Sequence, residues 1–74
     1  MRREMTTMVK EFYEDFYGCT ASILRHPSGK SLLTVRVTQG DLIHSKTYST
    51  YRGARIALGI YSDGTATLKE RKDV

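Results

Sequence analysis

The side chains that could ligate a metal or act as nucleophiles are few and widely spaced. The candidate metal ligands are Cys19, His26 and His44, and they form no C-x-x-C or H-x-x-x-H pair. A structural zinc site needs four well-placed ligands, so we expect no metal site. Nucleophilic catalysis would need Cys19 or a serine beside a base. Because Cys19 directly follows Gly18, at a junction that favours a small, half-buried residue, we expect packing rather than catalysis there.

Neither acid–base catalysis nor phosphate binding by a glycine-rich loop is predicted. Glu11, Glu14 and Asp15 fall on the polar side of a predicted helix, whereas catalytic carboxylates need a cleft that separates their pKa values. The segment Gly29-Lys30-Ser31 resembles the end of a phosphate-binding loop, but Leu24 stands where the first glycine is required. We therefore expect a protein that is not an enzyme, with no catalytic residue, no cofactor and no small-molecule substrate.

Basic side chains are concentrated in the middle of the chain. Residues 19–62 carry six basic side chains and one acidic one, whereas the whole chain has a formal net charge of +4. Such a distribution favours an anionic partner, DNA or RNA first. The alternative is a mildly basic small domain whose charge serves no specific partner.

An outer sheet face is predicted to carry the binding residues. If Leu33, Val35 and Val37 face the core, Arg36 points outward from its strand, and side chains of the two neighbouring strands could join it. Arginine and lysine contact phosphates, while tyrosine and histidine stack on bases. The candidate nucleic-acid-binding residues are Arg25, Arg36, His44, Lys46, Tyr48, Arg52 and Arg55. An exposed antiparallel face is also polar in proteins that bind no nucleic acid, so this alternative stays open.

Length and composition predict one small domain over residues 1–74, with residues 71–74 as a frayed tail. The single cysteine excludes an internal disulfide, which favours a reducing, cytoplasmic setting. No run of about 18 apolar residues occurs, so we expect neither a signal peptide nor contact with a membrane.

The N-terminal segment has the apolar spacing of a helix. Six apolar residues recur at i, i+3, i+4, i+7, i+8 and i+11: Met5, Met8, Val9, Phe12, Tyr13 and Phe16. This spacing predicts an amphipathic helix over residues 3–17 that packs on the protein's own sheet. Gly18 is placed to end the helix, since it adopts positive φ without strain.

Three strands are predicted next, as an antiparallel meander over residues 19–26, 32–38 and 42–49. Pro27 to Lys30 and Gln39 to Asp41 supply the turns. The middle strand alternates most regularly, so we expect it to lie at the centre of the sheet. Both alternate sets of the third strand mix polar and apolar residues, which leaves its register open.

The segment from Ser49 to Tyr61 supports two interpretations. Ser49 or Thr50 can cap a helix that runs to about Tyr61, with small residues against the sheet and Arg52 and Arg55 exposed. Alternate residues from Ala54 to Ile60 are also apolar, and the turn at Ser62-Asp63-Gly64 would suit a β-hairpin over residues 53–71. We favour the helix, because of the cap and the Ala-x-x-Ala-Leu spacing. A short strand to about Lys69 could follow.

The element order strand–strand–strand–helix has a loose similarity to two kinds of nucleic-acid-binding module. One is the three-strand-plus-helix DNA-binding module of integrase arms, and the other is the double-stranded RNA-binding domain. The similarity is carried by residues 34–37, 47–50 and 54–58. A double-stranded RNA-binding domain has a Lys-Lys pair at the start of its last helix, where this chain has Tyr51-Arg52.

The predicted fold is therefore α+β. It has an N-terminal amphipathic helix, a three-stranded antiparallel meander and a second helix on the same sheet face. The predicted function is that of a small, non-enzymatic nucleic-acid-binding or accessory module. The alternative is a protein-interaction or structural domain, a homodimer joined through the apolar surface of residues 51–61, whose apolar arc is wider than one sheet face requires.

Overall fold

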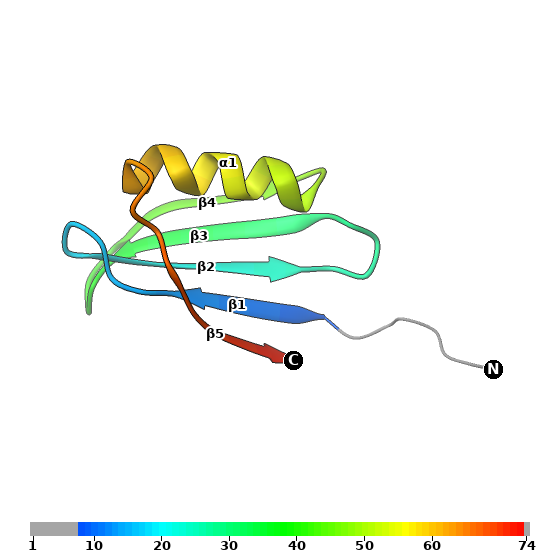
Figure 1. Cartoon of the computed structure of the whole chain (residues 1–74), viewed down its shortest axis with the longest axis horizontal. Coiled ribbons are helices and arrows are strands. Elements are labelled where there is room, and N and C mark those ends of the chain that lie inside the picture. The colour runs from blue at the N-terminus through cyan, green and yellow to red at the C-terminus, as the bar shows by residue number, and fades with distance from the viewer. Residues whose placement is uncertain (1–7, 74) are drawn as a thin grey trace.

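The computed structural model describes residues 8–73, which form a five-stranded antiparallel sheet with one helix on one face (Figure 1). The elements are β1 (Val9–Tyr13), β2 (Cys19–Arg25), β3 (Ser31–Val37), β4 (Leu42–Tyr48), α1 (Tyr51–Ser62) and β5 (Leu68–Asp73). The strand order is β4-β3-β2-β1-β5, so the chain returns after α1 to pair β5 with β1. The predicted strands at β2, β3 and β4 are confirmed, but β2 lies at the centre rather than β3.

The predicted N-terminal helix is wrong, and so is the two-helix fold built on it. Residues 9–13 form β1, which pairs with β2 on one side and β5 on the other; residues 3–7 lie outside the described part of the chain. Every second residue of this segment also fits a strand: Glu11 and Tyr13 are buried, while Lys10 and Phe12 lie on the opposite face and are half-buried. Valine and aromatic residues favour strands, and the backbone hydrogen bonds of two neighbouring strands outweigh the helical spacing.

Gly18 ends no helix but completes a tight hairpin turn. Tyr17 and Gly18 both have positive φ, 50° and 74°, which is the geometry of a two-residue type I′ turn. Phe16 and Cys19 close the turn, with N–H···O distances of 2.9 and 2.8 Å between their backbones. This turn sets β1 antiparallel to β2.

The helix predicted after Ser49 is confirmed as α1, and the hairpin alternative over residues 53–71 is wrong. Thr50 is the N-cap, and its Oγ1 accepts a hydrogen bond from the Gly53 N–H at 3.0 Å. Ala54 and Leu58 are buried against the sheet, one turn apart. Asp63, in the left-handed conformation, ends the helix.

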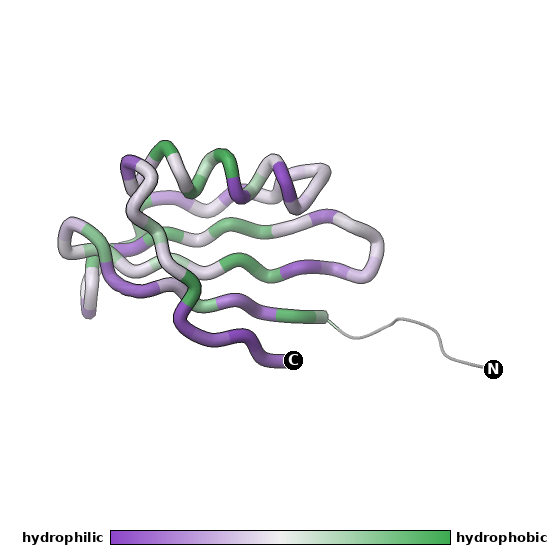
Figure 2. Tube along the Cα trace, viewed as in Figure 1, coloured by the Kyte–Doolittle hydropathy of each residue, from purple (hydrophilic) through white to green (hydrophobic). Residues whose placement is uncertain are grey.

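The core lies between α1 and one sheet face, which we call the helix face. Its buried apolar members come from β1, β2, β3, α1 and the β1–β2 turn: Tyr13, Phe16, Ala21, Ile23, Leu33, Val35, Ala54 and Leu58. Hydrophobic segments accordingly gather in the middle strands and along α1, whereas β5 is hydrophilic beyond its first residue (Figure 2). Val37, predicted to face the core, is 44% exposed at the end of β3.

The C-terminal segment is paired further than the sequence predicts. β5 runs to Asp73, and Arg71 lies opposite Glu11 of β1. The strand therefore includes residues 71–73 of the predicted frayed tail. Within residues 8–73, no helix is both long and apolar enough to cross a membrane.

Candidate nucleic-acid interface

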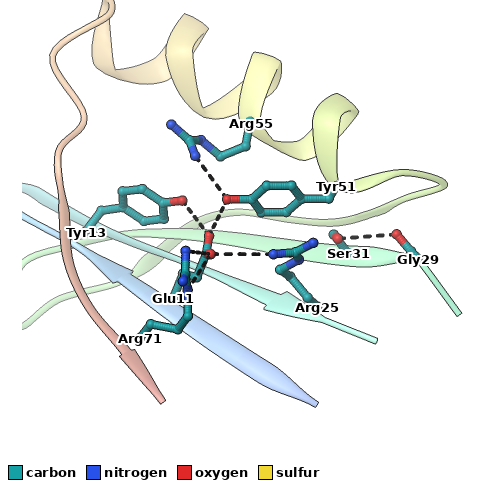
Figure 3. A network of polar contacts seen from close by, with 8 residues as sticks. All are labelled: Glu11, Tyr13, Arg25, Gly29, Ser31, Tyr51, Arg55 and Arg71. Carbon is teal, nitrogen blue, oxygen red and sulfur yellow. Dashed lines mark hydrogen bonds and ion pairs between the residues drawn. The ribbon is translucent and has the colours of Figure 1, made fainter. Parts of the chain in front are cut away.

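A buried carboxylate, that of Glu11, joins α1 and β5 to the middle of the sheet (Figure 3). Its Oε1 accepts hydrogen bonds from the Tyr51 hydroxyl at 2.6 Å and from the Tyr13 hydroxyl at 2.8 Å. Its Oε2 accepts one from Arg71 Nε at 3.1 Å, and Arg25 Nη1 lies 3.8 Å away. Four residues from β1, β2, β5 and α1 thus meet one carboxylate.

The electrostatics of this cluster keep Glu11 ionised. Burial alone raises the pKa of Glu11, but hydrogen bonds from Tyr51, Tyr13 and Arg71 outweigh it and hold the pKa below 4.5. Burial, hydrogen bonding and the nearby carboxylate raise the pKa of the Tyr13 hydroxyl well above its usual range. Glu11 is 0% exposed, so its oxygens serve the other members of the cluster and face no solvent. The cluster therefore fixes β1, β2, β5 and α1 relative to one another.

Two candidate nucleic-acid-binding residues, Arg25 and Arg55, belong to this cluster. The Arg25 guanidinium lies over the Tyr51 ring, 3.8 Å from its centroid. Arg55 Nη1 donates a hydrogen bond to the Tyr51 hydroxyl at 3.0 Å, which raises the pKa of Arg55. Both guanidiniums lie on the helix face (Figure 3), held against an aromatic ring or hydroxyl.

The candidates from β4 also lie on the helix face. Their cross-strand partners in β3 are Val35, Leu33 and Ser31, all buried. Side chains of directly opposed residues share a face, so His44, Lys46 and Tyr48 point to the same side as α1. The prediction that they join Arg36 on the outer face is wrong. Pairing fixes the register of β4, and neither alternate set of its residues is apolar enough to indicate it.

An aromatic cluster surrounds His44 at this edge. Its Nε2 lies 3.1 Å from the Tyr48 hydroxyl, and its Nδ1 lies 2.9 Å from the Tyr61 hydroxyl of α1. The Lys46 ammonium lies 5.3 Å from the centroid of the Tyr48 ring. Arg52, in the first turn of α1, is exposed. Six of the seven candidates are therefore on α1 or on the helix face, and they do not form one surface with Arg36.

Arg36 lies on the opposite side of the sheet, which no described element covers. We call this side the open face. The register of β1, β2 and β3 aligns its side chains in rows. Phe12, Ser22 and Thr34 form the middle row. Lys10 lies in the row on one side, and Thr20 and Arg36 form the row on the other.

A shallow depression of about 490 Å³ occupies this part of the open face. Its polar and charged lining residues are Lys10, Asp15, Thr20, Ser22, Thr34, Arg36 and Lys69. The Phe12 ring lies among them, with the Lys10 ammonium 5.3 Å from its centroid. Three cations and one carboxylate thus line the same depression as a half-buried ring and three hydroxyl groups.

These cations have no carboxylate partner in the described part of the chain. The ion pairs there join Arg25 and Arg71 to Glu11, and Lys72 to Glu70. None involves Lys10, Arg36 or Lys69. Their charges are therefore available to an anion that approaches the open face.

Sequence reasoning missed Lys10 and Phe12 because it assigned residues 3–17 to a helix. It missed Lys69 because it placed this residue at the end of a short strand to which it gave no partner strand. Two signals could have identified the strand. One is the pair Tyr17-Gly18, which suits a two-residue hairpin turn. The other is the density of valine and aromatic residues before it.

Comparison with known protein families, with curated proteins and with solved structures finds no match for this chain. Within residues 8–73, no three histidine, cysteine, aspartate or glutamate side chains lie together as a metal-binding group. The proposal below therefore rests on the geometry of the open face.

Proposed function

We propose that the protein binds single-stranded nucleic acid on the open face, as a non-catalytic module. The observation that carries this proposal is the depression that Lys10, Arg36 and Lys69 line together with Phe12. Cations near an aromatic ring on a protein surface are the combination by which proteins bind single strands, because the cations contact phosphates and the ring stacks with a base. A reducing, cytoplasmic setting fits the single cysteine and is part of the proposal.

The arrangement of the rows separates the two kinds of contact. The middle row offers the Phe12 ring and the hydroxyls of Ser22 and Thr34, which suit bases. Lys10 and Arg36 lie in the flanking rows, roughly 10 Å apart across the strands and roughly 13 Å apart along them. A single strand that crosses the sheet diagonally would place phosphates near both cations and an unstacked base over the ring.

A single strand is favoured over a duplex because the Phe12 ring lies on the flat surface of the sheet. In a duplex the bases are stacked on one another and their faces are inaccessible, whereas an open sheet with an aromatic residue accepts bases that have been splayed out. The recognised chemistry, phosphate plus base, is shared by DNA and RNA. Oligonucleotides of both kinds are therefore part of the test.

The test measures fluorescence anisotropy of labelled oligothymidine and oligouridine at low salt. Three phosphate contacts predict that log K falls with log salt at a slope of about −2, and Arg36→Gln should reduce the slope to about −1.4. Lys46→Gln is the matched control, since it removes the same charge from the opposite face of the sheet. Phe12→Leu, which keeps an apolar side chain, should weaken binding by about tenfold or more.

Three results would each reject the proposal or a part of it. Absence of binding at low salt would reject nucleic-acid binding altogether. Equal weakening by Arg36→Gln and Lys46→Gln would reject the open face as the site, because only one of these residues lies there. A preference for duplex over single strands would reject the role given to Phe12.

A further inference from the structure

The two edges of the sheet differ in chemistry. At one edge, β5 carries Lys69, Glu70, Arg71, Lys72 and Asp73 in succession, all exposed. Charged side chains along an edge strand prevent other strands from pairing with it. This edge therefore has the composition of a protected one.

The opposite edge, β4, lacks this protection. Lys46 is its only charged residue, and no described strand pairs with its outer side. Leu42 is 53% exposed and Ile43 is 48% exposed at its start. An edge of this composition can accept a further strand.

Two backbone hydrogen bonds, one at each end of the β2–β3 pair, show how these strands pair. The His26 N–H donates to the Lys30 carbonyl, and the Thr38 N–H donates to the Gly18 carbonyl. Both bonds fit the same pattern, in which the backbone groups of even-numbered β3 residues bond to β2. Odd-numbered residues of β3 therefore bond to β4.

This alternation identifies the free backbone groups of β4. From His44 to Tyr48, its even-numbered residues lie opposite the odd-numbered residues of β3 and bond to them, whereas Leu42 lies opposite Arg36 beyond a register shift. The N–H and C=O groups of Ser45 and Thr47 consequently point away from the sheet. They form a short unpaired edge that a strand could extend.

We propose that a second copy of this chain pairs with this edge, β4 against β4 and antiparallel, with the two-fold axis at Ser45. Ser45 is the middle residue of β4, so this register pairs the whole strand with itself. It sets Lys46 opposite His44 of the other copy. A shift that put the axis at Lys46 would set two lysines directly opposite each other, which is destabilising.

The surroundings of the edge complement this register. Lys46 would approach the rings around His44 in the second copy, including the 40% exposed Tyr61 of its helix. A lysine ammonium is attracted to the faces of such rings. Because the axis is perpendicular to the sheet, both helices lie on one side. Two sheets of five strands then become one of ten, with a continuous open face.

Sedimentation equilibrium without nucleic acid tests the dimer, independently of the proposed function. The wild-type chain should sediment as a dimer whose dissociation follows mass action. Ser45→Lys and Ser45→Glu each place like charges opposite each other on the axis, so each should weaken the dimer by up to about fivefold. An equimolar mixture of the two variants should restore dimers, and Ser45→Ala should sediment like the wild type.

Amide hydrogen exchange provides a second measurement without substitution. The amides of Ser45 and Thr47 point to solvent in a single copy, and they should become protected as concentration increases. A wild-type monomer at all concentrations would overturn the proposal. So would a dimer that both charged variants retain, or a dimer in which these two amides exchange freely, because either result would place the interface elsewhere.

Discussion

Replacing the buried carboxylate, Glu11→Gln, should destabilise the fold more than any loss of an exposed charge. The glutamine carbonyl can still accept hydrogen bonds from Tyr13 and Tyr51, which both donate to Oε1. The amide nitrogen then replaces Oε2 and presents N–H groups to Arg71, which is itself a donor. The substitution therefore removes a charge-assisted hydrogen bond and brings two donors together.

The magnitude follows from the exposure of the partners. Removing one member of a fully buried ion pair costs about 3–5 kcal/mol. The side chains of Arg71 and Arg25 are 56% and 42% exposed, so both can turn into water and the cost is smaller. We expect a loss of about 2–3 kcal/mol, in the upper part of the range for hydrogen bonds to charged groups. A domain of 74 residues has roughly 4–11 kcal/mol of stability in total.

Thermal unfolding followed by circular dichroism measures the effect. The expected loss corresponds to a decrease in Tm of about 10–20 °C for a domain of this size. Glu70→Gln is the matched control. It neutralises a half-exposed carboxylate that pairs with Lys72 at 3.4 Å, and should change stability by less than about 0.5 kcal/mol. Equal stabilities of the two variants would refute the structural role assigned to Glu11.

The same carboxylate makes stability depend on pH. Folding lowers the pKa of Glu11 below 4.5, so at acidic pH the unfolded chain takes up this proton first. The stabilisation is complete above the unfolded pKa and is lost as pH falls through 4.5 and then through the folded pKa. Urea unfolding between about pH 6 and pH 3 should show this loss in the wild type. The loss should be smaller in Glu11→Gln than in Glu70→Gln, and equal slopes would contradict the assignment.

Substitutions in the helix and in the first turn test the local geometry. Thr50→Ala removes the acceptor of the Gly53 N–H and should cost about 1 kcal/mol, whereas Ser49→Ala, at an exposed neighbour, should cost little. Gly59→Ala should stabilise the fold by about 0.5–1 kcal/mol, because a Cβ on this helical residue meets nothing within 4 Å. Gly18→Ala should have the opposite sign and cost about 1–2 kcal/mol, since φ is +74°. Urea unfolding measures each change, and a stabilising Gly18→Ala would contradict the turn.

Local patterns account for the parts of the fold that were predicted. The strict alternation of β3, the turns on either side of it, and the Thr50 cap before Ala54 and Leu58 depend on residues close in sequence. Backbone sterics and local hydrogen bonds are sufficient to favour these conformations. The open face was predicted in part for the same reason, since the alternation of β3 separates Arg36 from Leu33 and Val35.

For residues 9–13, the local sequence pattern is not sufficient to decide the secondary structure. Their apolar spacing fits both a helix and a strand, and the segment becomes a strand because β2 and β5 hydrogen-bond to it from both sides. One of those partners, β5, lies at the other end of the chain. The error in this segment changed the interpretation of Glu11 from a solvated carboxylate to a buried one. It also concealed Lys10 and Phe12.

The sequence by itself determined the strands β2, β3 and β4, the helix after Thr50, a surplus of positive charge and the absence of close-spaced thiolate or histidine pairs. The tertiary structure alone decided which side of the sheet the charges outside β3 occupy. Lys46 and Arg36 both lie on neighbouring strands and both look exposed in sequence, yet they lie on opposite faces because Lys46 is paired with the buried Leu33. Strand register is set by contacts between segments that are distant in sequence. A shift of one residue would move every side chain of the strand to the other face of the sheet.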